Sequence, residues 1–266
     1  MHRPTTLAFL AAVTAGGLAV AGATGATPAA LAATATPAAL AATATPAGHP
    51  AIRASYTRGS AGYVTGGGWR FRYVGASLKI PACRADPASN AGAAISLSGD
   101  TRYLPSIHTR YLASIAVVCG GGAHSVGYFG RRFGSGAFRL SPDVGDVLTI
   151  RIYHQAGHDY FTATDTTAGT TQPVAVATPA VVVYRHATLL ASIHATRRSV
   201  AASDLRLWEF RNTSVTSASG KHGTLSGPWA TYQLIGTADG TAAGRLTISA
   251  SYPSGNGRQF SVWLRH

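Results

Sequence analysis

The stretch VLTIRIY (147–153) alternates apolar and polar side chains at almost every step. Successive side chains in an extended strand point to opposite sides, so Leu148, Ile150 and Ile152 share one face and Tyr153 belongs to the other. This period of two indicates a strand that is buried on one side only. The stretch therefore predicts a β-sheet that packs one face against a core.

The same alternation recurs in WRFRY (69–73), where it places Trp69, Phe71 and Tyr73 on one face. Further runs of this kind are separated by glycine-rich turn signals, and helical periodicity is nearly absent. One segment, ATLLASIHATRRS (187–199), is ambiguous between a strand and a short helix. Many short strands require a second sheet to cover each apolar face. The pattern thus predicts an all-β sandwich.

The beginning of the chain differs from this pattern. A basic start, MHR, is followed by the apolar run LAFLAAVTAGGLAV (7–20), which is typical of a secretory signal peptide. We therefore expect a signal peptide at 1–25 and secretion of an extracellular protein. Residues 26–52 contain two copies of ALAATATPA and are expected to form a flexible linker or a leftover pro-region, which leaves one β-sandwich domain at 53–266. No later stretch is long and apolar enough to suggest a membrane span.

The charge balance is strongly basic. Lys and Arg number 22 against 9 Asp and Glu, which gives a net charge of +13. Such a surface attracts polyanions in a salt-dependent way. A coding bias that favours arginine is the other explanation of the same composition. The two cysteines, Cys83 and Cys119, predict one disulfide in an exported protein, with two separate buried thiols as the alternative.

The sequence lacks the residues that several kinds of catalysis require. The chain has no G-x-S-x-G sequence for a nucleophile elbow, and its carboxylates offer poor candidates for a glycosidase pair. His154, His158 and Asp159 flank the turn of an expected hairpin, and we interpret them as solvated turn residues rather than as a zinc site. No metal, cofactor or specific nucleic-acid partner is expected, and the protein is expected to be a monomer.

Five segments together resemble a known family: GYVTGGGWRFRYVGASLKIPAC (62–83), AAISLSG (93–99), ASIAVVCGG (113–121), FRLSPDVGDVLTIRIY (138–153) and YFTATDTTAG (160–169). In this order they are similar to the glutamic peptidases of family G1, the eqolisins. The resemblance implies a concanavalin A-like jelly-roll sandwich of two antiparallel sheets. It also implies a glutamate and a glutamine that together activate a water for peptide cleavage at acid pH.

By this resemblance, the position of the catalytic glutamine is held by Ala113, whose methyl group forms no hydrogen bond. The counterpart of the glutamate falls around 130–132, and no carboxylate lies between Thr101 and Pro142. Glu209 is the one glutamate of the chain and lies far downstream, in LRLWEF (205–210). We expect it to face outward and to pair with an arginine. No catalytic residue is therefore assigned.

A groove with aromatic and arginine side chains and no acid would suit an extended polymer, since sugars stack on aromatic rings and anions pair with guanidinium groups. The expected groove residues are Tyr111, Ile115, Arg131, Trp263 and Arg265. The sequence thus favours a secreted, non-catalytic module that binds a polysaccharide, polyanion or peptide of the cell envelope or the surroundings. The alternative is an acid endopeptidase whose catalytic pair comes from other strands.

Overall fold

The computed structural model describes residues 52–83, 89–99, 112–120, 122–130, 134–179, 182–195, 208–237, 240–244 and 246–264. All regular elements in these ranges are strands, so the described part of the chain contains no helix that could cross a membrane. The expected signal peptide at 1–25 lies outside the described residues, as does the linker at 26–52 except for Ile52.

Sixteen strands make up the described part of the fold. In chain order they are β1 (Arg53–Arg58), β2 (Ser60–Gly66), β3 (Phe71–Lys79), β4 (Ser89–Ser98), β5 (Leu112–Gly120), β6 (Ala123–Gly130), β7 (Gly134–Ala137), β8 (Val147–Gln155), β9 (His158–Asp165), β10 (Thr170–Ala177), β11 (His186–Ala195), β12 (Trp208–Ser217), β13 (His222–Gly223), β14 (Ala230–Thr237), β15 (Leu246–Ala250) and β16 (Phe260–Leu264).

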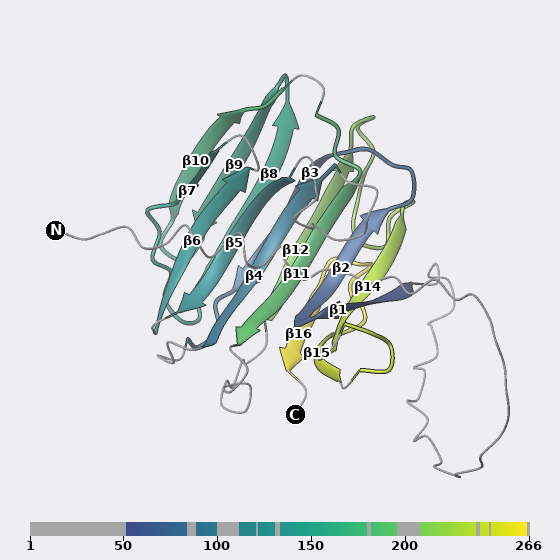
Figure 1. The fold of residues 1–266 in the computed structure, drawn as a ribbon. Coiled ribbons are helices and arrows are strands. Elements are labelled where there is room, and N and C mark those ends of the chain that lie inside the picture. Colours follow the sequence, from purple (N-terminus) through teal and green to yellow (C-terminus); the bar gives the residue numbers. More distant parts are fainter. Residues whose placement is uncertain are drawn as a thin grey trace, which may run out of the picture.

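The strands form two layers (Figure 1). The first layer has the order β14-β2-β11-β4-β5-β6-β7, and the second has the order β10-β9-β8-β3-β12-β16. The layers face each other, since β4 contacts β3 and β8 while β6 contacts β9. The all-β sandwich predicted from the alternation is therefore confirmed, and β11 shows that the ambiguous segment forms a strand as far as Ala195.

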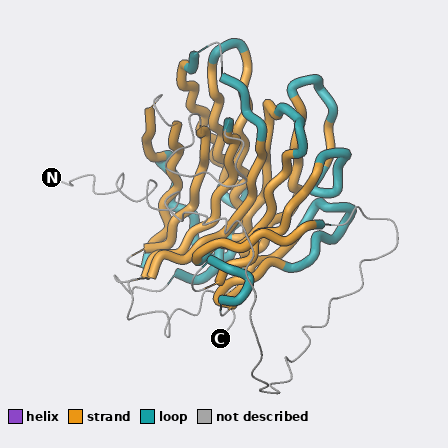
Figure 2. Tube along the Cα trace, turned by 45° about the vertical axis from the view of Figure 1, so that its right-hand side comes forward, coloured by secondary structure: helices purple, strands orange, loops and turns teal. Residues whose placement is uncertain are grey.

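The two layers are joined along one side. Strand β15 pairs with β16 of the second layer and with β14 of the first, so the hydrogen-bonded ladder runs continuously from one layer into the other. Figure 2 shows the strands curving round the molecule with loops gathered at their ends. Among the described strands, one pairing is parallel: β1 lies beside β14, with Arg53 opposite Tyr232.

The core lies between the layers and confirms the faces predicted for VLTIRIY. Leu148, Ile150 and Ile152 are fully buried there. Opposite them, β4 and β5 contribute Ile95 and Ile115, which are also fully buried. Because apolar burial supplies most of the free energy of folding, this shared interior holds the two layers together.

The face predicted for WRFRY is wrong in one respect. Phe71 is buried in the core, but the next core residue of β3 is Val74, and Tyr73 lies on the outer face. The cause is an irregular pairing with β12, whose register shifts between Thr216 and Ser217. Such a bulge adds a residue to one strand and changes which side chains face the core. Tyr73 is thereby turned outward.

Cys83 and Cys119 form a disulfide, as the sequence predicts. It ties the segment that follows β3 in the second layer to β5 in the first layer. The bond therefore links the two layers covalently.

Candidate functional site

The position expected for the catalytic glutamine faces the interior of the sandwich. Ala113 of β5 is fully buried in the core and lies in register with Leu97 of β4, which in turn pairs with Ala187 of β11. On the other side of Ala113 the partner is Gly130 of β6. This row across four strands carries no ionisable or amide side chain, so it offers no group that could activate water.

The expected groove residues are not brought together among the described residues. Ile115 is fully buried in the core between the layers, so it does not line an open groove, which corrects that prediction. The reason is that β5 is covered on both faces: Ala116, on its other side, is also buried. Trp263 is half-buried on β16 opposite Ser249. Tyr111, Arg131 and Arg265 lie outside the described residues.

Glu209 faces outward from β12, between the core residues Trp208 and Phe210. Its carboxylate accepts a hydrogen bond from the guanidinium of Arg211, two residues along the same strand. The predicted outward orientation and arginine partner of Glu209 are therefore present in the structure.

Glu209 nevertheless lines a small hollow, which we call the β12–β16 hollow. It has a volume of about 210 Å³, and its lining consists of Glu209, Phe210, Arg211, Ser251, Ser254, Gln259, Phe260 and Ser261. The carboxylate of Glu209 on β12 and the carboxamide of Gln259, just before β16, thus share one cavity, while Ala113 lies on β5 of the other layer. Within the described part of the chain no hydrogen bond joins Glu209 to Gln259.

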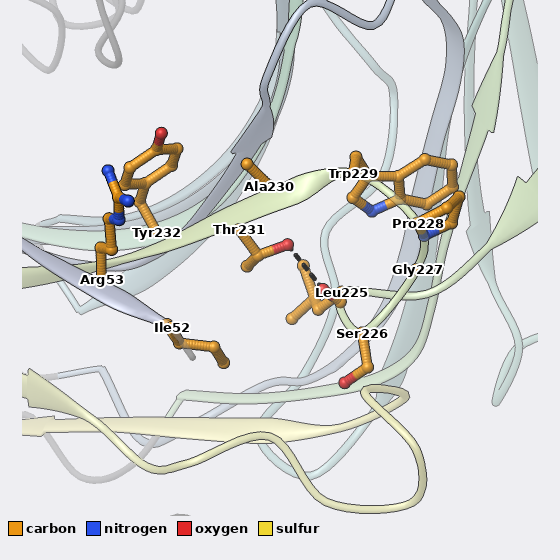
Figure 3. A pocket seen from close by; sticks show the side chains of 10 residues that line it. All are labelled: Ile52, Arg53, Leu225, Ser226, Gly227, Pro228, Trp229, Ala230, Thr231 and Tyr232. Atoms are coloured by element: carbon orange, nitrogen blue, oxygen red, sulfur yellow. Dashed lines mark hydrogen bonds between the residues drawn. The ribbon is translucent and has the colours of Figure 1, made fainter. Parts of the chain in front are cut away.

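A larger open cleft lies where β1 begins and β14 starts (Figure 3). We call it the β14 cleft. It encloses about 500 Å³, and its lining consists of Ile52, Arg53, Leu225, Ser226, Gly227, Pro228, Trp229, Ala230, Thr231 and Tyr232. Arg53 and Tyr232 stand together on one side, and Pro228 and Trp229 lie on the other (Figure 3). The lining contains one cation and no carboxylate.

The wall of the β14 cleft is held rigidly. Trp229 is almost fully buried, packs edge-on against Trp69 and Phe71, and donates its ring N–H to the Thr224 carbonyl at 3.0 Å. Thr231 donates its hydroxyl to the Leu225 carbonyl at 2.6 Å, which fixes the connection into β14. Because this wall is anchored, the cleft is pre-formed, and a ligand would not have to order it.

The residues of this cleft carry no signal in the sequence. Arg53 and Tyr232 are brought together only by the parallel pairing of β1 with β14. Strands far apart in the sequence pair through the completed fold, and alternation does not reveal which ones will be neighbours.

A buried polar cluster lies at the β8–β9 hairpin and corrects the prediction of solvated turn residues. Asp159 is fully buried; one of its carboxylate oxygens lies 2.8 Å from Nδ1 of His154, and the other accepts the Tyr184 hydroxyl at 2.5 Å. Burial, and then the neighbouring carboxylate, raise the pKa of Tyr184 well above its usual range, so that its hydroxyl remains a donor. His158 is exposed and contacts its own turn at Ala156, so His154 and His158 do not converge on a metal.

Comparison with known proteins identifies the architecture. No family model and no curated protein matches the sequence. Solved structures do match. A complex of scytalidoglutamic peptidase with a peptide-based transition-state analogue superimposes with a TM-score of 0.59 at 14% identity, covering 78% of this chain and 98% of the other. The eqolisin SCP-B, bound to the tripeptide Ala-Ile-His, gives a TM-score of 0.56 at 13% identity with the same coverage.

The chain has the fold of a glutamic peptidase. At this level of identity the likeness concerns the fold, and it confirms the architecture that the five sequence segments implied. Function has to be argued from the sites, because one fold carries many activities.

Proposed function

We propose that this protein is a secreted, non-catalytic member of the glutamic-peptidase fold that binds a polymeric ligand outside the cell. The observation that carries the proposal is the row of Ala187, Leu97, Ala113 and Gly130, where the resemblance implies a water-activating group and the chain has none. The expected signal peptide supports secretion.

The β14 cleft supports the binding part of the proposal. It is open, pre-formed and lined by Arg53 and Tyr232 without a carboxylate. A guanidinium pairs with anionic groups, while Tyr232 and Pro228 offer apolar contact. This is the combination that the sequence favours for a polymer, and it comes from residues other than the expected ones.

The first test is retention on insoluble polymers. We expect the full chain to be held by at least one of peptidoglycan, chitin and immobilised heparin, and to remain partly bound when salt screens simple charge attraction. Arg53→Gln should weaken this binding about tenfold or more, because it removes a charge-assisted hydrogen bond. Arg139→Gln, which removes an exposed arginine that does not line the cleft, is the matched control. Loss of all retention at high salt would contradict the proposal.

A second candidate function is acid endopeptidase activity, and the β12–β16 hollow is the observation that favours it. Glu209 and Gln259 line this hollow together with three serines. The pairing of Glu209 with Arg211 argues against it, because a guanidinium bonded to the carboxylate competes with the water that a general base must hold.

Casein digestion at about pH 2 to 5 separates the two functions. Under the main proposal the wild-type chain leaves casein intact. Under the alternative it cleaves casein, Glu209→Gln abolishes cleavage, and Asp143→Asn, which changes an exposed carboxylate outside the hollow, preserves it. Cleavage that depends on Glu209 would therefore replace the main proposal with the alternative.

A further inference from the structure

The outer face of the second layer carries a row of three tyrosines. Tyr73 of β3 lies directly opposite Tyr153 of β8, and Tyr153 lies directly opposite Tyr160 of β9. Side chains of directly opposed residues stand on the same face of a sheet. The ring centroids of Tyr153 and Tyr160 are 6.4 Å apart, and the rings are inclined by 36°. We call Tyr73, Tyr153 and Tyr160 the tyrosine row.

The row is open to solvent. Tyr160 is 40% exposed, and Tyr73 and Tyr153 are half-buried. Beyond Tyr160 the neighbouring strand β10 presents the small residue Ala175, so the row is not walled off at that end. None of the three tyrosines belongs to the core. The face is therefore an aromatic surface that the packing of the sandwich does not use.

A glycine shapes one end of the row. A Cβ atom placed on Gly75 would lie 2.4 Å from the hydroxyl oxygen of Tyr73, so the ring of Tyr73 lies down along its own strand over Gly75. Ser214 of β12 donates a hydrogen bond to that hydroxyl at 3.4 Å, which holds the ring in this position. The lack of a side chain at Gly75 therefore leaves room for this ring.

Two arginines lie near the tyrosine row. The Arg72 guanidinium lies 5.9 Å from the centre of the Tyr153 ring, and Arg151 is exposed in the next row across the sheet, opposite Gly75 and Thr162. Among the described strand residues of this face, Glu209 carries the one carboxylate, and it is already paired with Arg211. The area around the tyrosines is thus cationic without a free acid.

We infer that the tyrosine row is a binding site for an acidic polysaccharide built of hexuronate units; the inference rests on the proposed function and adds a second polymer-binding surface, apart from the β14 cleft. Pyranose rings carry one face of C–H groups that packs on an aromatic ring, and the rings of Tyr153 and Tyr160 are close enough for one saccharide chain to contact both. Arg72 and Arg151 are placed to pair with the uronate carboxylates. A flexible polyanion without sugar rings would use the arginines alone and leave the row unused.

The test is titration calorimetry of the full chain with polygalacturonate and with neutral galactan. Polygalacturonate should bind more tightly than galactan. Tyr160→Ala should weaken polygalacturonate binding about tenfold, since it removes a stacking ring, whereas Tyr160→Phe keeps the ring and should bind as the wild type does. Gly75→Ala should also weaken binding, because it displaces Tyr73 without removing an aromatic residue.

Arg151→Gln separates charge from stacking. It should weaken polygalacturonate binding, leave galactan binding unchanged and reduce the salt dependence. Arg139→Gln, which removes an exposed arginine outside the tyrosine row, should leave polygalacturonate binding intact. The thermal unfolding midpoint of each variant shows whether it folds. If Tyr160→Ala does not fold, Tyr153→Ala is used in its place to remove a stacking ring.

The outcomes distinguish the two proposals. If Tyr160→Ala and Tyr153→Ala both bind polygalacturonate as the wild type does, the tyrosine row is not the site and the proposed function stands. Retention on other polymers without binding to polygalacturonate overturns the inference in the same way. A chain that binds no polymer at all refutes both.

Discussion

Replacing Tyr184 by phenylalanine removes one oxygen atom from the buried polar cluster at the β8–β9 hairpin. The Tyr184 hydroxyl donates to Oδ2 of Asp159 at 2.5 Å, and Asp159 is fully buried. In Tyr184→Phe this carboxylate oxygen loses its hydroxyl donor in a place that bulk water does not reach, while His154 still contacts the other oxygen at 2.8 Å.

The magnitude follows from the charge and the burial. A hydrogen bond to a charged group contributes about 1.5–3 kcal/mol, so we expect Tyr184→Phe to lower the free energy of unfolding by about 2 kcal/mol. For a domain of this size that corresponds to a decrease in Tm of roughly 4–8 °C. The ring itself is retained, so its apolar packing contributes little to the change.

Urea unfolding measures this loss directly. Tyr73→Phe is the matched control: it removes a hydroxyl at the surface whose bond from Ser214 is long, 3.4 Å, and should cost less than about 0.5 kcal/mol. The double variant Tyr184→Phe/Asp159→Asn should lose less unfolding free energy than the sum of the losses in the two single variants, because both substitutions affect the same hydrogen bond. Equal stabilities of Tyr184→Phe and Tyr73→Phe would refute the importance of this cluster.

Three further predictions concern stability. Cys83→Ser/Cys119→Ser should lower the free energy of unfolding by about 4 kcal/mol, the loop-closure entropy for a separation of 36 residues; unfolding curves of the wild type that coincide with and without reductant would contradict this. Burial lowers the pKa of His124 below 6.5, so below pH 6.5 the unfolded chain takes up a proton that the folded chain excludes. Stability should therefore fall as the pH drops through the unfolded-state value of 6.5, and His124→Leu should reduce that fall in thermal melts. Gly62→Ala would place a Cβ atom 2.2 Å from the Leu189 carbonyl oxygen, so β2 and β11 must separate, and we expect little folded protein by circular dichroism.

The strands that are covered on one side could be predicted well. In VLTIRIY the apolar face, Leu148, Ile150 and Ile152, is the buried face, because alternation directly reports burial on one side. Burial on both sides removes that signal. Ala113 and Ile115 belong to such a strand, and the sequence alone did not tell that they face the interior rather than a groove.

The candidate sites depended on contacts between distant segments. Arg53 and Tyr232 meet through the pairing of β1 with β14, Glu209 and Gln259 through the pairing of β12 with β16, and Asp159 is buried beneath Tyr184. Tyr73 joins its two partners because of the register shift in β3. Each of these facts involves a neighbouring strand, which the local pattern does not specify.

The sequence by itself determined that this chain forms a β-sandwich, that Cys83 and Cys119 are bonded, and that Glu209 faces outward beside an arginine. These features follow from alternation and from a small number of partners, which are properties of the chain read locally. The tertiary structure alone decided which polar groups are buried and which aromatic rings remain exposed. The physical reason is that the free-energy cost of burying a charged group depends on which partners the other layer brings to it. Whether an aromatic ring remains exposed likewise depends on whether the other layer or an adjacent strand covers it.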